Sequence, residues 1–161
     1  MGKIINFEDL KNIKEKGKKV VFCSGCYDIL HSGHIIFFKQ CKQFGDSLVV
    51  GLGRDKIIKE LKGNSRPINN EQNRLFLLAA LEIVDYVILN EEKMLPGKID
   101  FYNIIKELRP DFFVLNDDDS SIKEKKARLD ELDIKLKLVK REVPNFLKAT
   151  SSTDIIKKMG L

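Results

Sequence analysis

Short apolar runs recur along the chain, and most are followed by segments in which apolar residues return every three or four positions. Four runs are typical of buried strands, at residues 20–22, 47–52, 86–89 and 112–115. A fifth, residues 134–139, alternates apolar residues with lysines and predicts an edge strand. Strands that alternate with helices predict a parallel sheet with helices on both faces. We therefore expect an α/β fold built on a five-stranded parallel sheet.

The segments between these runs have the apolar period of helices. The clearest begins near Ser32, places Ile35, Phe38 and Cys41 on one side, and runs to about residue 44, where Gly45 ends it. Asn69 and Gln72 form a plausible capping pair for another helix. Further helices are expected at residues 7–16, 55–61, 101–108 and 120–132, and after Thr150. Polar loops separate the elements at residues 62–70, 90–100 and 140–149.

Composition places the chain among ordinary globular proteins. Its 161 residues suffice for one domain, expected to span residues 1–161, and 43% of them are hydrophobic. No apolar run is long enough to cross a bilayer, and the N-terminal residues are too charged for a signal peptide. The odd number of cysteines, three, argues against a disulfide framework. We therefore expect a cytoplasmic protein with reduced thiols and no membrane partner.

The formal charge of +5 comes from 29 basic and 24 acidic residues. The lysines are spread along the chain and interleaved with acids, as in the stretch 123–126, which is typical of a solvated helix. No cluster of basic residues is interleaved with aromatic ones, so we do not expect a nucleic-acid partner. A modest positive excess suits a small substrate rich in phosphate.

Both histidines of the chain, His31 and His34, lie where the loop after the first strand meets its helix. Their spacing places the two rings near one face of the first turn, and Gly33 keeps that turn free of another side chain. A helix N-terminus offers unpaired N–H groups and a partial positive charge, which suit a phosphate. Two imidazoles there can donate hydrogen bonds as charge develops on phosphate oxygens.

Other interpretations of this stretch exist. Cys23 and Cys26 with the two histidines could bind zinc, but a spacer of four residues is much shorter than in finger-type sites. A thioredoxin-like redox pair is also conceivable, although the helix begins several residues after Cys26 and both histidines then have no role. Ordinary loop histidines and buried cysteines are the third alternative.

Several further candidates follow predicted strands. Asn116, Asp118 and their acidic neighbours could hold Mg²⁺ or ribose hydroxyls, or could equally cap the next helix. Four hydroxyl residues, 150–153, stand at a helix start with Lys148 before them and suit a phosphate. Ligands of parallel sheets bind beyond the carboxyl ends of the strands, so these groups, residues 53–55 and the histidines should share one edge.

Three cations complete the candidate site. Lys62 and Arg66 lie on a polar loop and suit a phosphate. Arg74 lies near the start of a helix, where a cation opposes the helix dipole. A charge so placed is a functional candidate, with a plain surface arginine as the alternative.

The stretch Gly25-Cys26-Tyr27-Asp28, followed by His31-Ser32-Gly33-His34, resembles the signature of the cytidylyltransferase-like nucleotidyltransferases. That signature is Gly-x-Phe-Asp, two residues, then His-x-Gly-His, and Tyr27 in place of Phe is a mild departure. The resemblance implies a Rossmann-like fold and transfer of a nucleoside monophosphate from an NTP to a phosphorylated small molecule, with release of pyrophosphate. It also implies Mg²⁺ with the triphosphate, no structural metal, and a homodimer.

The resemblance covers about residues 19–159. The sequence of residues 61–85 is most similar to that of heptose-phosphate adenylyltransferases. Glycerol-phosphate cytidylyltransferases are similar in general organisation but less so in this sequence. Residues 150–153 resemble the family's closing Ile-Ser-Thr-Thr. We therefore expect a sugar or polyol phosphate acceptor, with ATP favoured over CTP. The alternatives are a glycerol-3-phosphate-type cytidylyltransferase or another phosphorylated acceptor, namely choline phosphate, phosphopantetheine or FMN. A regulatory module that binds a nucleotide without catalysis is the alternative from a different class.

The resemblance and the residue chemistry together give the expected roles. Catalysis by in-line attack, without a covalent intermediate, is assigned to His31, His34, Lys62 and Arg74. Acceptor binding is assigned to Asp28, Lys62 and Arg66. Nucleotide binding is assigned to Gly25, Cys26, Tyr27, Asp28, Gly33, Asn116, Asp118, Thr150, Ser151, Ser152 and Thr153.

Overall fold

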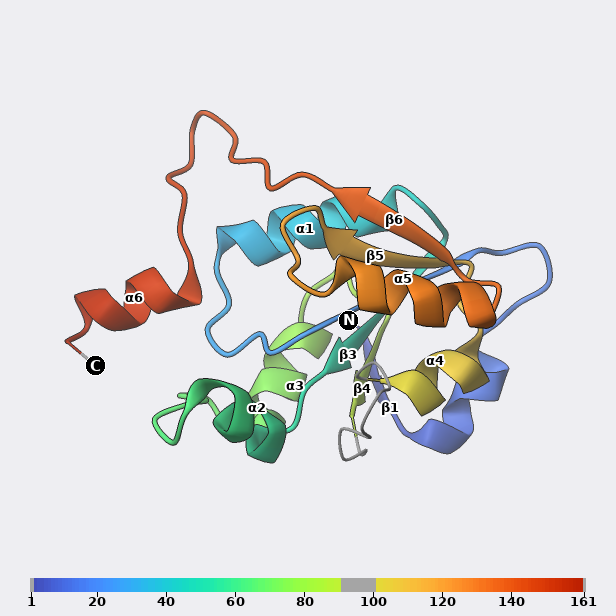
Figure 1. Ribbon diagram of the computed structural model, residues 1–161, viewed down its shortest axis with the longest axis horizontal. Coiled ribbons are helices and arrows are strands. Elements are labelled where there is room, and N and C mark those ends of the chain that lie inside the picture. The colour runs from blue at the N-terminus through green and yellow to red at the C-terminus, as the bar shows by residue number, and fades with distance from the viewer. Residues whose placement is uncertain (1, 91–100, 161) are drawn as a thin grey trace.

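The apolar runs form a parallel sheet in the computed structural model, which describes residues 2–90 and 101–160 (Figure 1). The sheet has six strands in the order β1-β4-β3-β2-β5-β6. Their bounds are Lys3–Ile5 (β1), Val20–Gly25 (β2), Ser47–Leu52 (β3), Tyr86–Leu89 (β4), Phe112–Asn116 (β5) and Lys135–Val139 (β6). The predicted edge position of β6 is confirmed.

The prediction of five strands was wrong, because β1 adds a sixth at the other edge. Its three residues pair with β4 in parallel, with Lys3 opposite Tyr86 and Ile5 opposite Ile88. A strand this short shows no period, so its apolar pattern carries no signal in the sequence. The prediction of a helix over residues 7–16 was also too long, since a 3-10 helix, η1, covers only Phe7–Asn12.

Helices cover both faces of the sheet, as predicted. They are α1 (Ser32–Lys42), α2 (Asp55–Lys62), α3 (Glu71–Ala79), α4 (Tyr102–Leu108), α5 (Ile122–Glu131) and α6 (Ser152–Lys158). One core cluster joins the sheet to η1, α4 and α5, and the other joins it to α1 and α3. In β2, Val20 and Phe22 belong to the first cluster, whereas Val21 and Cys23 belong to the second. No helix of the described ranges is long and apolar enough to span a bilayer.

Two local predictions change. Asn70, not Asn69, caps α3, because its side chain accepts a hydrogen bond from the backbone N–H of Asn73 at 2.9 Å. The predicted loop at residues 90–100 lies outside the described residues apart from Asn90.

The strand order changes direction at β2, and this positions the site. The chain moves from β2 through β3 to β4 on one side, then crosses to β5 and β6 on the other. β2 pairs with β3 through six residues, from Val20 to Gly25, but with β5 only through Val21 and Phe22. Both strands continue beyond that point, so their carboxyl ends separate. Such a switch point is where open α/β sheets bind ligands.

Candidate functional site

A cavity of about 340 Å³ lies where the ends of β2 and β5 separate. Its size is in the usual range for small-molecule sites. The lining contains the residues after β2, the start of α1, two cations of the predicted loop region, the end of β5 and the start of α6, namely Ser24, Gly25, Cys26, Tyr27, Asp28, Gly33, His34, Phe37, Lys62, Arg66, Leu115, Asn116, Asp119, Arg141 and Ser152. The structure therefore brings together residues that lie far apart in the sequence.

The two histidines lie against each other at the start of α1. His31 is the N-cap of the helix, and the backbone N–H of His34 donates to the carbonyl of His31 at 3.0 Å. Their rings are stacked, with centroids 3.8 Å apart and planes 27° apart. The Nδ1 atoms of both rings are buried and have no hydrogen-bond partner among residues 2–90 and 101–160. Buried polar atoms are normally paired, so this pair of atoms is suited to a ligand.

Burial keeps both imidazoles neutral. It lowers the pKa of His34 to about 3, and the positive charges of His31, Arg141 and Lys62 act in the same direction. The pKa of His31 is also lowered, first by burial and then by Arg141. At neutral pH each ring therefore has one N–H group to donate and one nitrogen that accepts.

Glycine and tyrosine shape the floor of the cavity. A Cβ atom on Gly33 would lie 3.1 Å from the His31 ring, which explains why a side chain is absent there. Tyr27 has a left-handed backbone with φ of 46°, and its buried ring packs edge-on against His34 with centroids 5.2 Å apart. A Cβ atom on Gly25 would lie 2.9 Å from the Tyr27 ring. Both glycines thus permit close approach to the residues that support the histidines.

Asp28 lines the cavity, but its carboxylate is occupied by the loop before α3. Oδ1 accepts from the backbone N–H groups of Ile68 and Asn69 at 2.8 and 2.9 Å, and Oδ2 accepts from Arg66 Nε at 2.6 Å. The Asp28 side chain is 1% exposed and that of Arg66 is 12% exposed. In this arrangement the two residues expected to bind the acceptor bind each other and fix the loop beside Lys62.

Arg74 does not reach the cavity, contrary to its expected catalytic role. It is fully buried, and its guanidinium donates to the Asn69 carbonyl, the Cys26 carbonyl and Asp55 Oδ1 at 2.9, 2.6 and 2.6 Å. Each of these partners belongs to a different segment around the site. The structure thus gives Arg74 a positioning role, which the helix dipole argument could not reveal because the partners are distant in sequence.

The acidic residues after β5 are held by protein groups. Asp119 accepts from the backbone N–H and the hydroxyl of Ser121 and from Lys125 Nζ. The N-cap of α5 is Ser121, so Asp119 braces the turn before the helix and does not cap it as one alternative expected. Asp118 accepts from Arg141 Nε at 2.6 Å. Across the described ranges, no three residues of the types His, Cys, Asp and Glu come together as a metal site. Asn116 lines the cavity without being part of these pairs.

The hydroxyl residues around the start of α6 have different surroundings. Ser151 caps the helix, since its hydroxyl accepts from the backbone N–H of Asp154 at 3.1 Å. Ser152 lines the main cavity and donates to the Ile29 carbonyl at 3.2 Å. Thr150 and Lys148 line a second cavity of about 200 Å³, together with His31 and Arg141. Thr153 is exposed.

Arg141 is a charged residue of the cavity lining that sequence reasoning missed. It follows β6 by two residues and lines both cavities. Its neighbours Lys140 and Glu142 make the segment look like an ordinary solvated surface. The sequence signal that could have found it was its position after a strand end, the same rule that predicted the other candidates.

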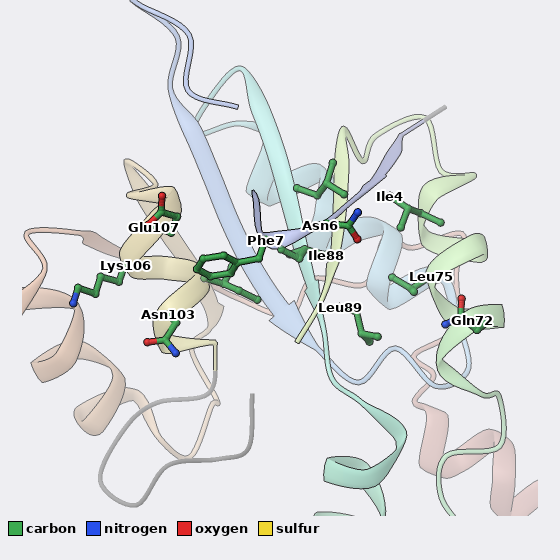
Figure 2. A pocket seen from close by; sticks show the side chains of 12 residues that line it. Ile4, Asn6, Phe7, Gln72, Leu75, Ile88, Leu89, Asn103, Lys106 and Glu107 are labelled. Carbon is green, nitrogen blue, oxygen red and sulfur yellow. The ribbon is translucent and has the colours of Figure 1, made fainter. Parts of the chain in front are cut away.

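A larger cavity of about 590 Å³ lies away from these residues, between α3 and α4 over the ends of β1 and β4 (Figure 2). Its floor is apolar, with Ile88 and Leu89, and Asn6, Gln72 and Asn103 project from its rim. None of the predicted site residues lines it. Chemistry, rather than volume, therefore selects the histidine cavity as the candidate site.

Known proteins are similar to this chain in sequence and in fold. The sequence model of one family, described as cytidylyltransferase-like, matches residues 22–158. A relative in Campylobacter fetus subsp. fetus, called bifunctional protein HldE, is 41% identical over 157 residues, which are 98% of this chain and 31% of the relative. This chain thus spans about a third of the length of the curated relatives it matches over nearly its whole length.

Two solved structures have a similar fold. A lipopolysaccharide core biosynthesis protein of Thermoplasma volcanium is 32% identical with a TM-score of 0.64, and the match covers 78% of this chain and 98% of the other. A pantoate-beta-alanine ligase of Francisella tularensis, complexed with beta-gamma ATP and beta-alanine, has a TM-score of 0.66, and the match covers 97% of this chain and 76% of the other. The latter is 18% identical, so that likeness concerns the fold alone.

Proposed function

The chain belongs to the cytidylyltransferase-like family, and from this premise we propose that it is a nucleotidyltransferase that acts on a phosphorylated small molecule. The observation that carries the proposal is the stacked pair of neutral histidines at the switch point of the sheet, whose buried Nδ1 atoms have no partner in the described part of the chain. An anion between them and the flanking cations Lys62 and Arg141 would satisfy these groups.

The reaction needs positioning and charge stabilisation more than covalent chemistry. A phosphate oxygen of the acceptor attacks the α-phosphorus of the nucleotide, the bond to the bridging oxygen breaks, and pyrophosphate leaves with the electron pair. His31 and His34 donate hydrogen bonds to phosphate oxygens as their charge increases. Neutral rings can fill this role, because each keeps one N–H group to donate. Thr150 and Ser152 add hydroxyl groups on the α6 side of the cavities.

Magnesium enters this proposal with the nucleotide, as part of the substrate. Mg²⁺ in such enzymes is usually held by phosphate oxygens, water and one or two carboxylates. Over the described parts of the chain, Asp28 and Asp119 line the cavity but already accept hydrogen bonds from protein donors. These residues fit a metal that arrives bound to the triphosphate better than a resident ion.

For the substrates we propose ATP and a sugar or polyol phosphate. The resemblance of residues 61–85 to heptose-phosphate adenylyltransferases supports this choice. So does the similarity to the Thermoplasma protein, which is described as a lipopolysaccharide core biosynthesis protein. Lys62 is the acceptor cation that remains exposed, because Arg66 is bound to Asp28. A cytoplasmic homodimer completes the proposal, by analogy with the family.

A coupled assay tests the proposal directly. Release of pyrophosphate would be followed with each of four NTPs, Mg²⁺ and a panel of sugar and polyol phosphates, and the product would be identified by mass spectrometry. We expect turnover with ATP and at least one sugar phosphate. Nucleotide binding without turnover on any phosphorylated acceptor would contradict an enzyme and favour a regulatory module. Light scattering on the same sample would test the dimer.

A further inference from the structure

A cavity of about 190 Å³, lined in part by residues of α2 and α5, adjoins the histidine cavity, and we call it the α5 cavity. Both linings contain Ser24, Gly25, Cys26 and Asp119, so the two cavities meet at the end of β2. None of its described lining residues also lines the cavity of about 200 Å³ that contains Thr150. The histidine cavity therefore has two separate extensions.

The lining of the α5 cavity is mostly apolar, but it contains an ion pair. The apolar residues are Ile57, Ile58, Leu61, Phe101 and Phe113. Lys125 Nζ donates to Asp119 Oδ2 at 2.8 Å, and these side chains are only 20% and 25% exposed. In contrast, Arg128 and Glu131 of the same helix form a pair in which each side chain is at least 40% exposed. Water therefore screens the pair in the cavity less than it screens the pair on the surface.

The ion pair keeps hydrogen-bonding capacity for a ligand. Asp119 Oδ1 accepts twice from Ser121, whereas Oδ2 accepts only from Lys125 among the residues that the structure describes. Burial by itself raises the pKa of Asp119, but hydrogen bonds from Lys125 and Ser121 outweigh it and leave the pKa lowered, so the carboxylate is ionised at neutral pH. The ammonium group of Lys125 has further N–H donors. A hydroxyl group can therefore donate to Asp119 and accept from Lys125 at the same time.

We propose that the α5 cavity holds the body of the acceptor, and that Asp119 and Lys125 select acceptors with hydroxyl groups there. This rests on the proposed function and deepens it. Leu61 lines the α5 cavity, and the next residue, Lys62, is the proposed acceptor cation and lines the histidine cavity. A phosphate held at Lys62 thus places the rest of the acceptor beside the apolar walls and the ion pair.

The charges of the two extensions support this assignment. A triphosphate in the α5 cavity would face the carboxylate of Asp119, whereas the described lining of the other extension has Arg141 and Lys148 against Glu142. A quaternary ammonium group, as in choline phosphate, has no N–H or O–H to donate to Asp119 and would meet the positive charge of Lys125. A site built to hydrogen-bond a hydroxyl rejects analogues that lack it, because its own polar groups then stay unpaired.

The competing explanation is that the ion pair only braces the turn before α5. The two explanations differ in which ligands respond when Lys125 is changed. Loss of a brace should weaken acceptors with and without hydroxyl groups alike. Loss of a hydroxyl contact should weaken only the acceptors that have hydroxyl groups.

The test uses two matched pairs of probes, glycerol 3-phosphate with propyl phosphate and mannose 1-phosphate with cyclohexyl phosphate. The second member of each pair has a similar carbon frame without hydroxyl groups. Calorimetry gives the Kd of each probe and of ATP, and the transfer assay gives KM for the probes that react. Wild-type protein should prefer the hydroxylated member of at least one pair by about tenfold or more, the scale of a hydrogen bond to a charged group.

Lys125→Met, which keeps an unbranched side chain but removes the donors, should reduce that preference about tenfold and leave the Kd for ATP unchanged. Lys125→Arg, which keeps donors and charge, should recover part of it. Lys126→Met is the matched control, because Lys126 pairs with Asp130 on the same helix with both side chains 59% exposed. The control should bind all probes as the wild-type protein does.

A Lys125→Met variant that keeps the wild-type preference would overturn the proposal, and so would a variant that loses both members of each pair equally. A wild-type protein without preference in either pair, or one that binds none of the probes, would also overturn it. The fate of the proposed function is separate. If the wild-type protein binds the hydroxylated probes but transfers no nucleotidyl group to any acceptor, the reaction is wrong while the Kd values still decide the role of Lys125. If transfer occurs only to acceptors without hydroxyl groups, the reaction stands and the selection by Asp119 and Lys125 is wrong.

Discussion

At the scale of the single residue, the proposed role of His34 sets two requirements for its side chain. It must be buried enough to stay neutral, and it must keep an N–H group available to a ligand. Packing meets the first demand, since the ring lies between His31 and Tyr27 at centroid distances of 3.8 and 5.2 Å. The unpartnered Nδ1 atom meets the second. Because the ring stays neutral, His34 offers a ligand one N–H group and adds no positive charge of its own.

Replacing His34 tests its catalytic role. His34→Ala should lower kcat by about 10²-fold or more, the usual result of losing one donor to a developing charge, while the Kd for ATP changes much less. His34→Asn, which keeps a donor near the same place, should recover part of the rate. Steady-state kinetics and calorimetry on the same preparations give both values. A His34→Ala enzyme as active as wild type would remove the residue from the mechanism.

The lowered pKa of His34 also predicts a pH dependence of stability. Its folded pKa is about 3, against about 6.5 in the unfolded chain, so between these values the unfolded state binds more protons. The free energy of unfolding should therefore be full above about pH 6.5 and fall as the pH drops toward 3. Urea unfolding measured across this window should show a flatter curve for His34→Asn. An unchanged curve would mean that carboxylates alone produce the acid sensitivity.

At the scale of the element, Arg74 shows that the sequence can reveal an unusual residue on a helix without revealing which segments it holds together. The chain predicts a cation out of place on α3, and the structure shows why it is there, since it joins the Cys26 loop, residue 69 and the start of α2. The loop before α3 is fixed in the same way by Asp28. Two buried charged residues therefore hold the segments around the site in place. Asp28 lines the cavity, and Arg74 does not.

Loss of Arg74 should therefore destabilise the protein rather than only slow it. Breaking a buried ion pair by removing one partner costs about 3–5 kcal/mol, and the lower end is expected because the Asp55 side chain is 28% exposed. Urea unfolding of Arg74→Ala measures this cost, with Arg128→Ala as the exposed control. Arg74→Lys should recover the charge but not the fork of three hydrogen bonds. Equal midpoints for Arg74→Ala and the control would contradict the positioning role.

At the scale of the whole molecule, the sequence predicted the strands that bury both faces and the sheet edge at which most of the candidate site residues lie. Val20 to Phe22 belong to such a strand, and the apolar period identified its neighbours. β1 could not be predicted, because three residues gain their structure from pairing with β4 and not from their own pattern. Arg141 was missed for a related reason, since its role depends on β5 and β6 lying side by side.

Metal removal from the whole protein distinguishes a structural zinc site from Mg²⁺ that binds with the triphosphate. If the histidine cavity binds a metal only with the triphosphate, a chelator should abolish turnover without changing the Tm, and added Mg²⁺ should restore activity. Metal analysis should find no stoichiometric zinc in the purified protein. Zinc that is lost together with the fold would revive the alternative in which Cys23 and Cys26 are ligands.

The separation of β2 from β5 has a mechanical consequence. Beyond Phe22 these strands stop pairing, so the sheet consists of two halves, β1-β4-β3-β2 and β5-β6, that are joined along a short seam. The candidate site lies at the open end of that seam, with Gly25 on one half and Asn116 and Arg141 on the other. A bound nucleotide would fasten the halves together where the backbone does not. Amide hydrogen exchange at the ends of β2 and β5 should then slow when ATP binds, and should slow more there than at β3 and β4. The exchange rates at these two strand ends would thus report whether the site is occupied.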